Sequence, residues 1–221
     1  MLIRREAIRR FIEADLYAIT DAPHARGRST EAVAAAMLAA GIRVIQYREK
    51  DKAPRTKLAE CRALRALTRQ AGALFIVNDH PDLALLTEAD GVHVGQQDYP
   101  PGEVRRLVGP ELLIGVSTHA PAEALRAQQD AAVDYIGVGP LFATRTKRDV
   151  CAAVGLEYLD FVVRNIELPF VAIGGIKLHN IRQVVERGAR TVAAVTEITG
   201  APDIGEIVGK LREQMVFDQI Y

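Results

Sequence analysis

The feature that most constrains the fold of this chain is an eightfold alternation of short apolar segments with helical segments. The apolar segments are often continuous, which is typical of strands buried on both faces of a parallel sheet. Strands are predicted at residues 15–21, 43–50, 73–77, 91–95, 112–116, 134–139, 170–173 and 191–195. Apolar residues at helical spacing follow them at residues 30–40, 54–71, 81–88, 101–108, 121–132, 155–165, 180–187 and 202–215.

Eight strand–helix units of this kind specify a (β/α)₈ barrel, or TIM barrel, in the α/β class. An open doubly wound sheet is the alternative, but it requires a glycine-rich turn after the first strand, and residues 20–23 do not form one. A short extra helix is predicted before the first strand, at residues 5–14. No linker or break in composition divides the 221 residues. We therefore expect one domain, with the N-terminal helix in residues 1–14 and the barrel in residues 15–215.

Charge and cysteine content argue against several classes of protein. Lys plus Arg and Asp plus Glu number 28 each, so no global basic field favours nucleic acid. Cys61 and Cys151, widely spaced, predict reduced thiols. The first residues are too charged for a signal peptide, and no apolar run reaches membrane-spanning length. We expect a cytoplasmic protein that binds neither nucleic acid nor membrane. The sequence does not specify an oligomeric state, and a homodimer is compatible with it.

Polar residues collect at the carboxyl ends of the predicted strands, where barrel enzymes carry their active sites. Gln46, Arg48 and Lys50 alternate along the second strand, so they are predicted to point the same way and form a cup for an anionic ligand. A basic cluster that caps the strand or faces solvent is the alternative. Further polar residues and glycines at this rim are Thr20, Asp21, Asn78, Asp79, Gln96, Gln97, Asp98, Ser117, His119, Gly174, Gly175, Thr196 and Glu197.

Asp79 and Asp98 follow the third and fourth strands, which are neighbours in a barrel. Two carboxylates at adjacent strand ends repel each other unless a cation lies between them. Oxygen ligands suit Mg²⁺, which proteins usually hold with one or two carboxylates together with substrate phosphates. In the alternative interpretation, each Asp caps the helix that follows it. We favour the Mg²⁺ site.

Two further groups are candidates for phosphate binding. Residues 144–148 read Thr-Arg-Thr-Lys-Arg and could clamp a diphosphate together with Arg48 and Lys50; a solvated run of charge is the alternative. Gly174–Gly175 and Val195–Thr196 follow the seventh and eighth strands, where barrels commonly bind phosphate through backbone N–H groups; a tight turn is the alternative.

The histidines add little to this set. His93 lies among valines in the fourth predicted strand, and we expect a hydrogen-bonded core residue rather than a base. His119, near the rim, is the remaining candidate for proton transfer. No cluster of His and Cys has the spacing of a transition-metal site.

With these residues identified, the sequence resembles the thiamine phosphate synthase family. The matching segments run in the family's order along the chain. They are residues 17–21, 46–50, 77–79, 90–98, 115–119, 134–140, 144–149 and 172–176.

The resemblance implies a TIM-barrel transferase of thiamine biosynthesis. Such an enzyme joins 4-amino-2-methyl-5-hydroxymethylpyrimidine diphosphate to 4-methyl-5-(2-phosphoethyl)thiazole, giving thiamine phosphate and diphosphate. The resemblance implies that Gln46 and Asn78 hold the pyrimidine, and that Asp79 and Asp98 bind Mg²⁺. The implied diphosphate-binding and catalytic residues are Arg48, Lys50, Ser117 and Lys147. The implied thiazole-phosphate residues are Thr144, Thr146, Gly175, Val195 and Thr196.

The mechanism that follows is dissociative: diphosphate leaves first, and the thiazole nitrogen attacks the resulting pyrimidine-methyl cation. Mg²⁺ and the cationic side chains act on the leaving group, whose charge grows in the transition state. No strong general base is required, which agrees with a rim that lacks a convincing one. A lid made by residues 141–152 is a further hypothesis.

Two rival functions remain open at this point. One is a relative that resembles the thiazole tautomerases and shares the barrel; the other is a non-catalytic barrel that binds thiamine precursors. The presence of Lys50, Asp98 and Lys147 favours the synthase over the first, and the intact pair of Asp79 and Asp98 argues against the second.

Three residues complete the sequence-based expectations. Family members often have Ser-Ala-Ile after the eighth strand, whereas this chain has Thr-Glu-Ile at residues 196–198. Glu197 brings a negative charge near the proposed phosphate site, and we expect its side chain to point away. Tyr47 and Glu49, on the other face of the second strand, are assigned to packing and surface pairing.

Overall fold

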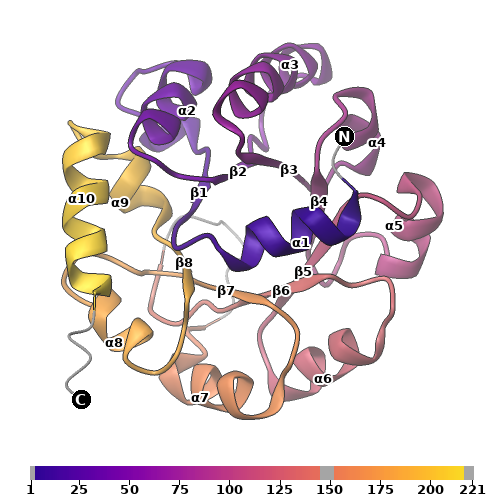
Figure 1. Ribbon diagram of the computed structural model, residues 1–221, viewed down its shortest axis with the longest axis vertical. Coiled ribbons are helices and arrows are strands. Elements are labelled where there is room, and N and C mark those ends of the chain that lie inside the picture. The colour runs from indigo at the N-terminus through magenta and orange to yellow at the C-terminus, as the bar shows by residue number, and fades with distance from the viewer. Residues whose placement is uncertain (1–2, 145–151, 217–221) are drawn as a thin grey trace.

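The computed structural model describes residues 3–144 and 152–216, and its eight parallel strands pair in chain order from β1 to β8. The strands are β1 Tyr17–Ile19, β2 Val44–Tyr47, β3 Leu74–Asn78, β4 Gly91–Val94, β5 Leu113–Thr118, β6 Tyr135–Val138, β7 Phe170–Ile173 and β8 Thr191–Ala193. The ring closes where Leu16 pairs with Val192, whose N–H donates to the carbonyl oxygen of Asp15 at 2.9 Å. Figure 1 shows the strands as a ring surrounded by helices. The predicted barrel is confirmed.

Helices follow every strand within the described residues, and local signals set several of their ends. Proline occupies the first turn of α3, α4, α5 and α6, where its missing N–H has no helical partner to lose. Ser29 caps α2 by accepting from Ala32 N–H at 3.1 Å, and Gly72 ends α3 with a φ of 65°. The outer helices are α2 Thr30–Ala39, α3 Pro54–Ala71, α4 Pro81–Leu86, α5 Pro101–Val108, α6 Pro121–Gln129, α7 Gly155–Asn165, α8 Ile181–Val185 and α10 Ile204–Met215.

The boundaries differ from the predictions at two places that matter for the site. β2 ends at Tyr47, so Arg48 and Lys50 lie in the loop after the strand rather than within it. β8 ends at Ala193, and residues Val195–Thr199 form an additional short helix, α9, instead of continuing the strand. A short 3₁₀ helix, Ala22–His24, also lies in the loop after β1.

The N-terminal helix α1, Arg4–Ile12, crosses the ring of strands and closes one end of the barrel (Figure 1). The Phe11 ring lies 4.3 Å from the Tyr135 ring, centroid to centroid, and Arg4 Nε donates to Asp134 Oδ1 at 2.5 Å. Phe11 belongs to the same apolar cluster as the first residues of several strands, including Val44 and Leu74. The helix therefore covers the amino ends of the strands, which leaves the carboxyl ends for ligands.

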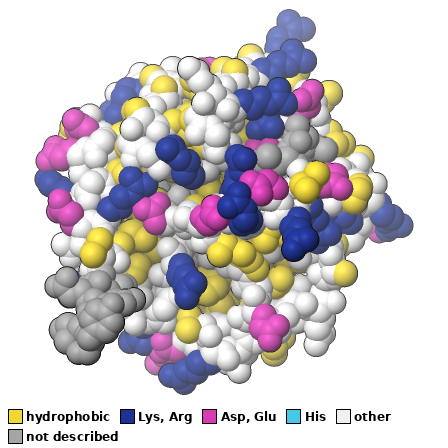
Figure 2. Space-filling view, in the orientation of Figure 1, with side chains coloured by type: hydrophobic (Ala, Val, Ile, Leu, Met, Phe, Trp, Pro, Cys, Tyr) yellow, Lys and Arg dark blue, Asp and Glu magenta, His cyan; other side chains and the backbone are white. Residues whose placement is uncertain are grey.

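Charged side chains of both signs mix on the face that carries α1 (Figure 2). This agrees with the equal numbers of acidic and basic residues in the sequence. Any binding of an anion must therefore come from local placement of cations. None of the helices in the described part of the chain combines the length and apolar character that crossing a membrane requires.

Candidate active site

A chain of neutral hydrogen-bonding side chains runs through the barrel interior. Gln46 Nε2 donates to the Tyr17 hydroxyl at 2.9 Å, and this hydroxyl lies 3.0 Å from the Tyr135 hydroxyl. The Tyr135 hydroxyl lies 3.2 Å from His93 Nδ1, and His93 Nε2 lies 2.9 Å from Ser117 Oγ. The chain therefore joins the ends of β2 and β5 across the inside of the barrel.

One assignment of protons satisfies all of these contacts. If Gln46 donates to the Tyr17 hydroxyl, that hydroxyl can donate to the Tyr135 hydroxyl, which in turn can donate to His93 Nδ1. His93 then carries its proton on Nε2 and donates it to Ser117 Oγ. Burial raises the pKa of Tyr17 and Tyr135, so both hydroxyls remain protonated. Ser117 thereby keeps its own proton for donation to an anionic ligand.

Glycine makes room for this chain at the centre of the barrel. Gly115 pairs with His93 on one side and with Tyr135 on the other. A Cβ atom at residue 115 would lie 2.1 Å from Tyr135 Cζ and 2.5 Å from His93 Nδ1. Only glycine is compatible with these two rings in their observed positions.

The residues predicted at this end of the barrel are brought together. Gln46 on β2 is buried, and Asn78 is the last residue of β3. In the ring of strands, β2 and β3 lie three and two strands away from β5, which carries Ser117. Asn78 pairs in register with His93, so it lies beside the hydrogen-bond chain. The expectation that His93 is a hydrogen-bonded buried residue is confirmed. Sequence reasoning missed Tyr17 and Tyr135, which read as ordinary apolar strand residues.

The cations predicted at the second strand lie in the loop after it. Arg48 N–H donates to Thr20 Oγ1 at 2.9 Å, which fixes the start of this loop against β1. Lys50 is largely exposed, and its Nζ lies 3.8 Å from Asp79 Oδ2. The predicted end of the second strand was wrong, because the strand stops at Tyr47, but Lys50 still reaches Asp79 at the neighbouring strand end.

Asp79 and Asp98 approach each other closely, as predicted. Burial and the neighbouring Asp98 carboxylate raise the pKa of Asp79, while Lys50 and Arg48 oppose that rise. Asp98 Oδ2 accepts from Gly95 N–H at 2.7 Å, and Asp79 adopts a left-handed conformation with a φ of 62°. A non-glycine residue at positive φ is strained, and such strain is concentrated at functional sites.

The alternative interpretation of this pair, helix capping, is wrong. The residues that precede α4 and α5 in capping position are His80 and Pro100, and neither helix receives a side-chain cap. The donor set that remains consists of carboxylate oxygens, which suits Mg²⁺. Across residues 3–144 and 152–216, no three His, Cys, Asp or Glu side chains come together as a metal site. A metal held here would therefore need oxygen ligands from substrate or water.

Glu49 corrects one prediction. Its side chain is buried rather than paired at the surface, and both carboxylate oxygens lie 3.2 Å from the Ala22 N–H, which donates to them. Burial raises its pKa, with Lys52 at 3.8 Å opposing the rise. Tyr47 packs in the core, as expected, and donates to Glu60 Oε2 at 2.6 Å. Glu49 therefore anchors the loop after β1.

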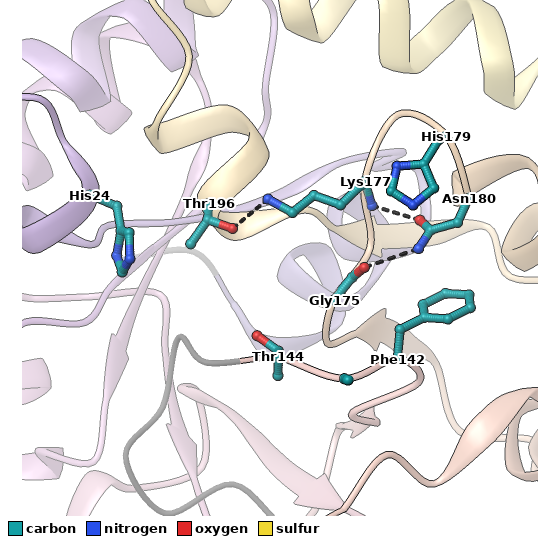
Figure 3. Close-up of a pocket in the computed structure, with 9 residues that line it drawn as sticks. His24, Phe142, Thr144, Gly175, Lys177, His179, Asn180 and Thr196 are labelled. Carbon is teal, nitrogen blue, oxygen red and sulfur yellow. Dashed lines mark hydrogen bonds between the residues drawn. The ribbon is translucent and has the colours of Figure 1, made fainter.

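A pocket of about 630 Å³ opens between the loops that follow β6, β7 and β8 (Figure 3). Gly174 and Gly175 have φ values of 99° and 65°, and a Cβ on Gly175 would lie 2.7 Å from the carbonyl oxygen of Ala143. The glycines thus allow the loops after β6 and β7 to pack closely. The lining residues are His24, Phe142, Ala143, Thr144, Gly175, Lys177, His179, Asn180 and Thr196.

Three of the predicted thiazole-phosphate residues, Thr144, Gly175 and Thr196, line this pocket. Val195, the first residue of α9, precedes Thr196 but is not among the described residues that line it. Thr146 and Lys147 lie outside the described residues, as do Cys151 and most of the proposed lid.

Comparison with known proteins decides the family. A model of the family described as thiamine monophosphate synthase matches residues 16–198. The chain belongs to this family. It is 59% identical over 211 residues to the thiamine-phosphate synthase of Pelotomaculum thermopropionicum, with 96% of each chain covered. It is 52% identical over 205 residues to that of Lawsonia intracellularis, covering 93% of this chain and 94% of the relative.

A solved structure supports the same relationship. The thiamine phosphate pyrophosphorylase of Pyrococcus furiosus superposes with a TM-score of 0.84 and 34% identity, covering 93% of this chain and 96% of that one. The resemblance to the thiamine phosphate synthase family, drawn from the sequence segments, is therefore confirmed.

Proposed function

We propose that this chain is a thiamine-phosphate synthase, a transferase that joins the pyrimidine diphosphate and the thiazole phosphate named above. The observation that carries the proposal is 59% identity, over nearly the whole chain, to a relative that bears this name. The arrangement of the rim supports it, because neutral groups, a carboxylate pair and a polar pocket lie at neighbouring strand ends. The ligands that this function requires are the two small-molecule substrates, a homodimer is compatible with it, and we place the reaction in the cytoplasm.

Binding of the pyrimidine falls to the neutral groups. Gln46 uses its Nε2 on Tyr17, and no contact to its amide oxygen occurs in the described part of the chain. That oxygen can therefore accept from the amino group of the pyrimidine, while Asn78 approaches from the next strand. The diphosphate then extends toward Arg48, Lys50 and the hydroxyl of Ser117.

The reaction breaks the bond between the pyrimidine methylene carbon and the diphosphate oxygen, and the electron pair leaves with the diphosphate. The thiazole nitrogen lone pair then forms the new carbon–nitrogen bond to the pyrimidine-methyl cation. Arg48, Lys50 and the Ser117 hydroxyl stabilise the charge that develops on the leaving oxygens, and Lys147 is assigned to the same task. None of these steps requires a general base.

Asp79 and Asp98 would hold Mg²⁺, which when bound supplies positive charge for the diphosphate. Support comes from the oxygen-only donors and from the raised pKa of Asp79, since two close carboxylates favour a bound cation. Lys50, 3.8 Å from Asp79, can interact with the same phosphate oxygens.

Incubation of the protein with both precursors and Mg²⁺ tests the proposal, with thiamine phosphate and diphosphate measured as products. Equal amounts of the two products are expected. A folded protein that binds both precursors but forms neither product would instead identify a non-catalytic binding protein. Conversion of a thiazole precursor without pyrimidine diphosphate would identify the tautomerase-like alternative.

A further inference from the structure

Lys177 is a cation in the pocket to which the proposed mechanism assigns no role. It follows β7 and extends across the pocket toward α9 (Figure 3). Its Nζ donates to Thr196 Oγ1 at 2.7 Å and lies 3.1 Å from Glu197 Oε2. The ammonium group therefore lies beside Thr196, a residue already assigned to the thiazole phosphate.

The backbone of Lys177 is fixed relative to the rest of the pocket. Its N–H donates to Asn180 Oδ1 at 2.7 Å, and Asn180 Nδ2 donates to the carbonyl oxygen of Gly175 at 3.1 Å. Asn180 is buried, and its side chain links these two backbone groups in a partly buried position. Lys177 and Gly175 are thus held on the same loop at a defined separation.

Glu197 orients the lysine, because its carboxylate lies against the Lys177 ammonium group. Its Oε1 accepts from Leu178 N–H at 3.1 Å, while Oε2 faces Lys177. Glu197 itself is not among the described residues that line the pocket. An ammonium group has three N–H donors, and Thr196 and Glu197 account for two of them within the described residues. The third is available to a ligand.

We infer that Lys177 binds the phosphate of the thiazole substrate and selects it over the unphosphorylated alcohol, with Glu197 as the positioning residue. This inference rests on the proposed function, because it assigns the pocket to the second substrate. A phosphate within reach of Thr144 and Thr196 would also be within reach of Lys177 Nζ. Lys177 and Glu197 together form a lysine–carboxylate pair that adds a phosphate-binding N–H without adding net charge.

Because of these charges, the single and the double variant should differ in their affinity for thiazole phosphate. Lys177→Met removes the cation and leaves the Glu197 carboxylate beside a phosphate dianion, so repulsion adds to the lost hydrogen bond. In the Lys177→Met/Glu197→Gln double variant the carboxylate is absent, and part of the affinity should return. Lys177→Arg retains a cation at the same place and should retain most of the affinity.

Steady-state kinetics on the full chain test the assignment, with both substrates varied in turn. Lys177→Met should raise the KM for thiazole phosphate roughly 10- to 30-fold, allowing for the partial exposure of the lysine. The KM for pyrimidine diphosphate should change by less than about twofold, because that substrate is assigned to other strand ends. The preference for thiazole phosphate over 4-methyl-5-(2-hydroxyethyl)thiazole should fall by a similar factor.

Lys210→Met is the matched control, since Lys210 forms an exposed pair with Glu206 on α10. A Lys177→Met variant that has the thermal stability of the wild type and the same KM for thiazole phosphate as the control would overturn the inference. The double variant would also overturn it by binding thiazole phosphate more weakly than Lys177→Met.

Calorimetric titration of thiazole phosphate separates this inference from the proposed function. Wild-type protein that forms no thiamine phosphate would refute the synthase proposal alone. Titration of the same protein then tests Lys177 directly: weaker binding in Lys177→Met supports the assignment, and equal binding refutes it.

Discussion

Replacement of Tyr135 by Phe removes a single hydroxyl from the middle of the chain that joins Gln46 to Ser117. That hydroxyl lies 3.0 Å from the Tyr17 hydroxyl and 3.2 Å from His93 Nδ1. The ring itself is retained, so its packing against α1 should remain. The substitution therefore tests whether the two ends of the chain depend on its centre.

The magnitude follows from the two contacts that are lost. Each buried hydrogen bond contributes about 0.5–1.5 kcal/mol, so the free energy of unfolding should fall by about 1–3 kcal/mol. For a protein of this length, a loss of about 2 kcal/mol lowers the Tm by about 4–8 °C. Without Tyr135 to accept from Tyr17, Gln46 and Ser117 lose their mutual alignment, and kcat/KM for pyrimidine diphosphate should fall roughly tenfold.

Thermal unfolding and steady-state kinetics measure the two effects, and Tyr158→Phe is the control. Tyr158 is also buried and donates to Thr118 Oγ1 at 2.6 Å, but its hydroxyl is not part of the chain from Gln46 to Ser117. Tyr158→Phe loses one hydrogen bond, so its free energy of unfolding should fall by about 0.5–1.5 kcal/mol, with little change in kcat/KM. Equal kinetic losses in the two variants would refute a positioning role for the interior chain and leave only a structural one.

Three further predictions concern other parts of the site and its support. Asp79→Asn should raise the Mg²⁺ concentration required for half-maximal activity roughly tenfold or more, which a metal titration measures. The same change relieves the repulsion between the two carboxylates, so it should raise the Tm in metal-free buffer, which a melting curve measures. Asp90→Asn weakens the partner of buried Arg65, which donates to it at 2.7 and 3.0 Å, and should lower the unfolding free energy by about 3–5 kcal/mol in urea. Gly175→Ala forces a side chain into a φ of 65° and should lower stability by about 1–3 kcal/mol while raising the KM for thiazole phosphate.

The barrel and the strand ends could be predicted because both depend on local patterns. Apolar runs of strand length, each followed by helical spacing, define the fold without any knowledge of long-range contacts. The fold then places Gln46, Asn78 and Ser117 on one rim, and it brings Asp79 beside Asp98. The repeated strand–helix pattern was therefore enough to predict where these residues lie.

The interior hydrogen-bond chain could not be predicted in the same way. Tyr17 and Tyr135 are far apart in the sequence, and each lies in an apolar strand where a tyrosine is ordinary. His93 was placed in the core, but its contact with Ser117 Oγ depends on the register of β4 and β5. Register across a closed barrel is a property of the whole fold rather than of any segment.

Glu197 places a negative charge next to a predicted phosphate site, and only the fold shows which cation compensates for it. A carboxylate next to Thr196 contradicts a phosphate site when read along the chain alone. Its partner, Lys177, belongs to the preceding strand–helix unit, and the two meet because β7 and β8 are neighbours. A residue that breaks the expected pattern is therefore a reason to examine the adjoining strand end for a compensating charge.

The division between neutral and charged groups has a physical cause. The groups inside the barrel are an amide, two tyrosine hydroxyls and an imidazole, whereas Lys50, Asp79 and Lys177 lie in loops beyond the strands. A charge placed in the interior would lose its hydration, and burial already raises the pKa of both tyrosines. Substitutions inside the barrel should therefore alter alignment and stability together, while substitutions of loop charges should alter affinity for phosphate or metal with smaller changes in Tm. Measurements of ligand affinity and of Tm are therefore enough to distinguish interior variants from variants of loop charges.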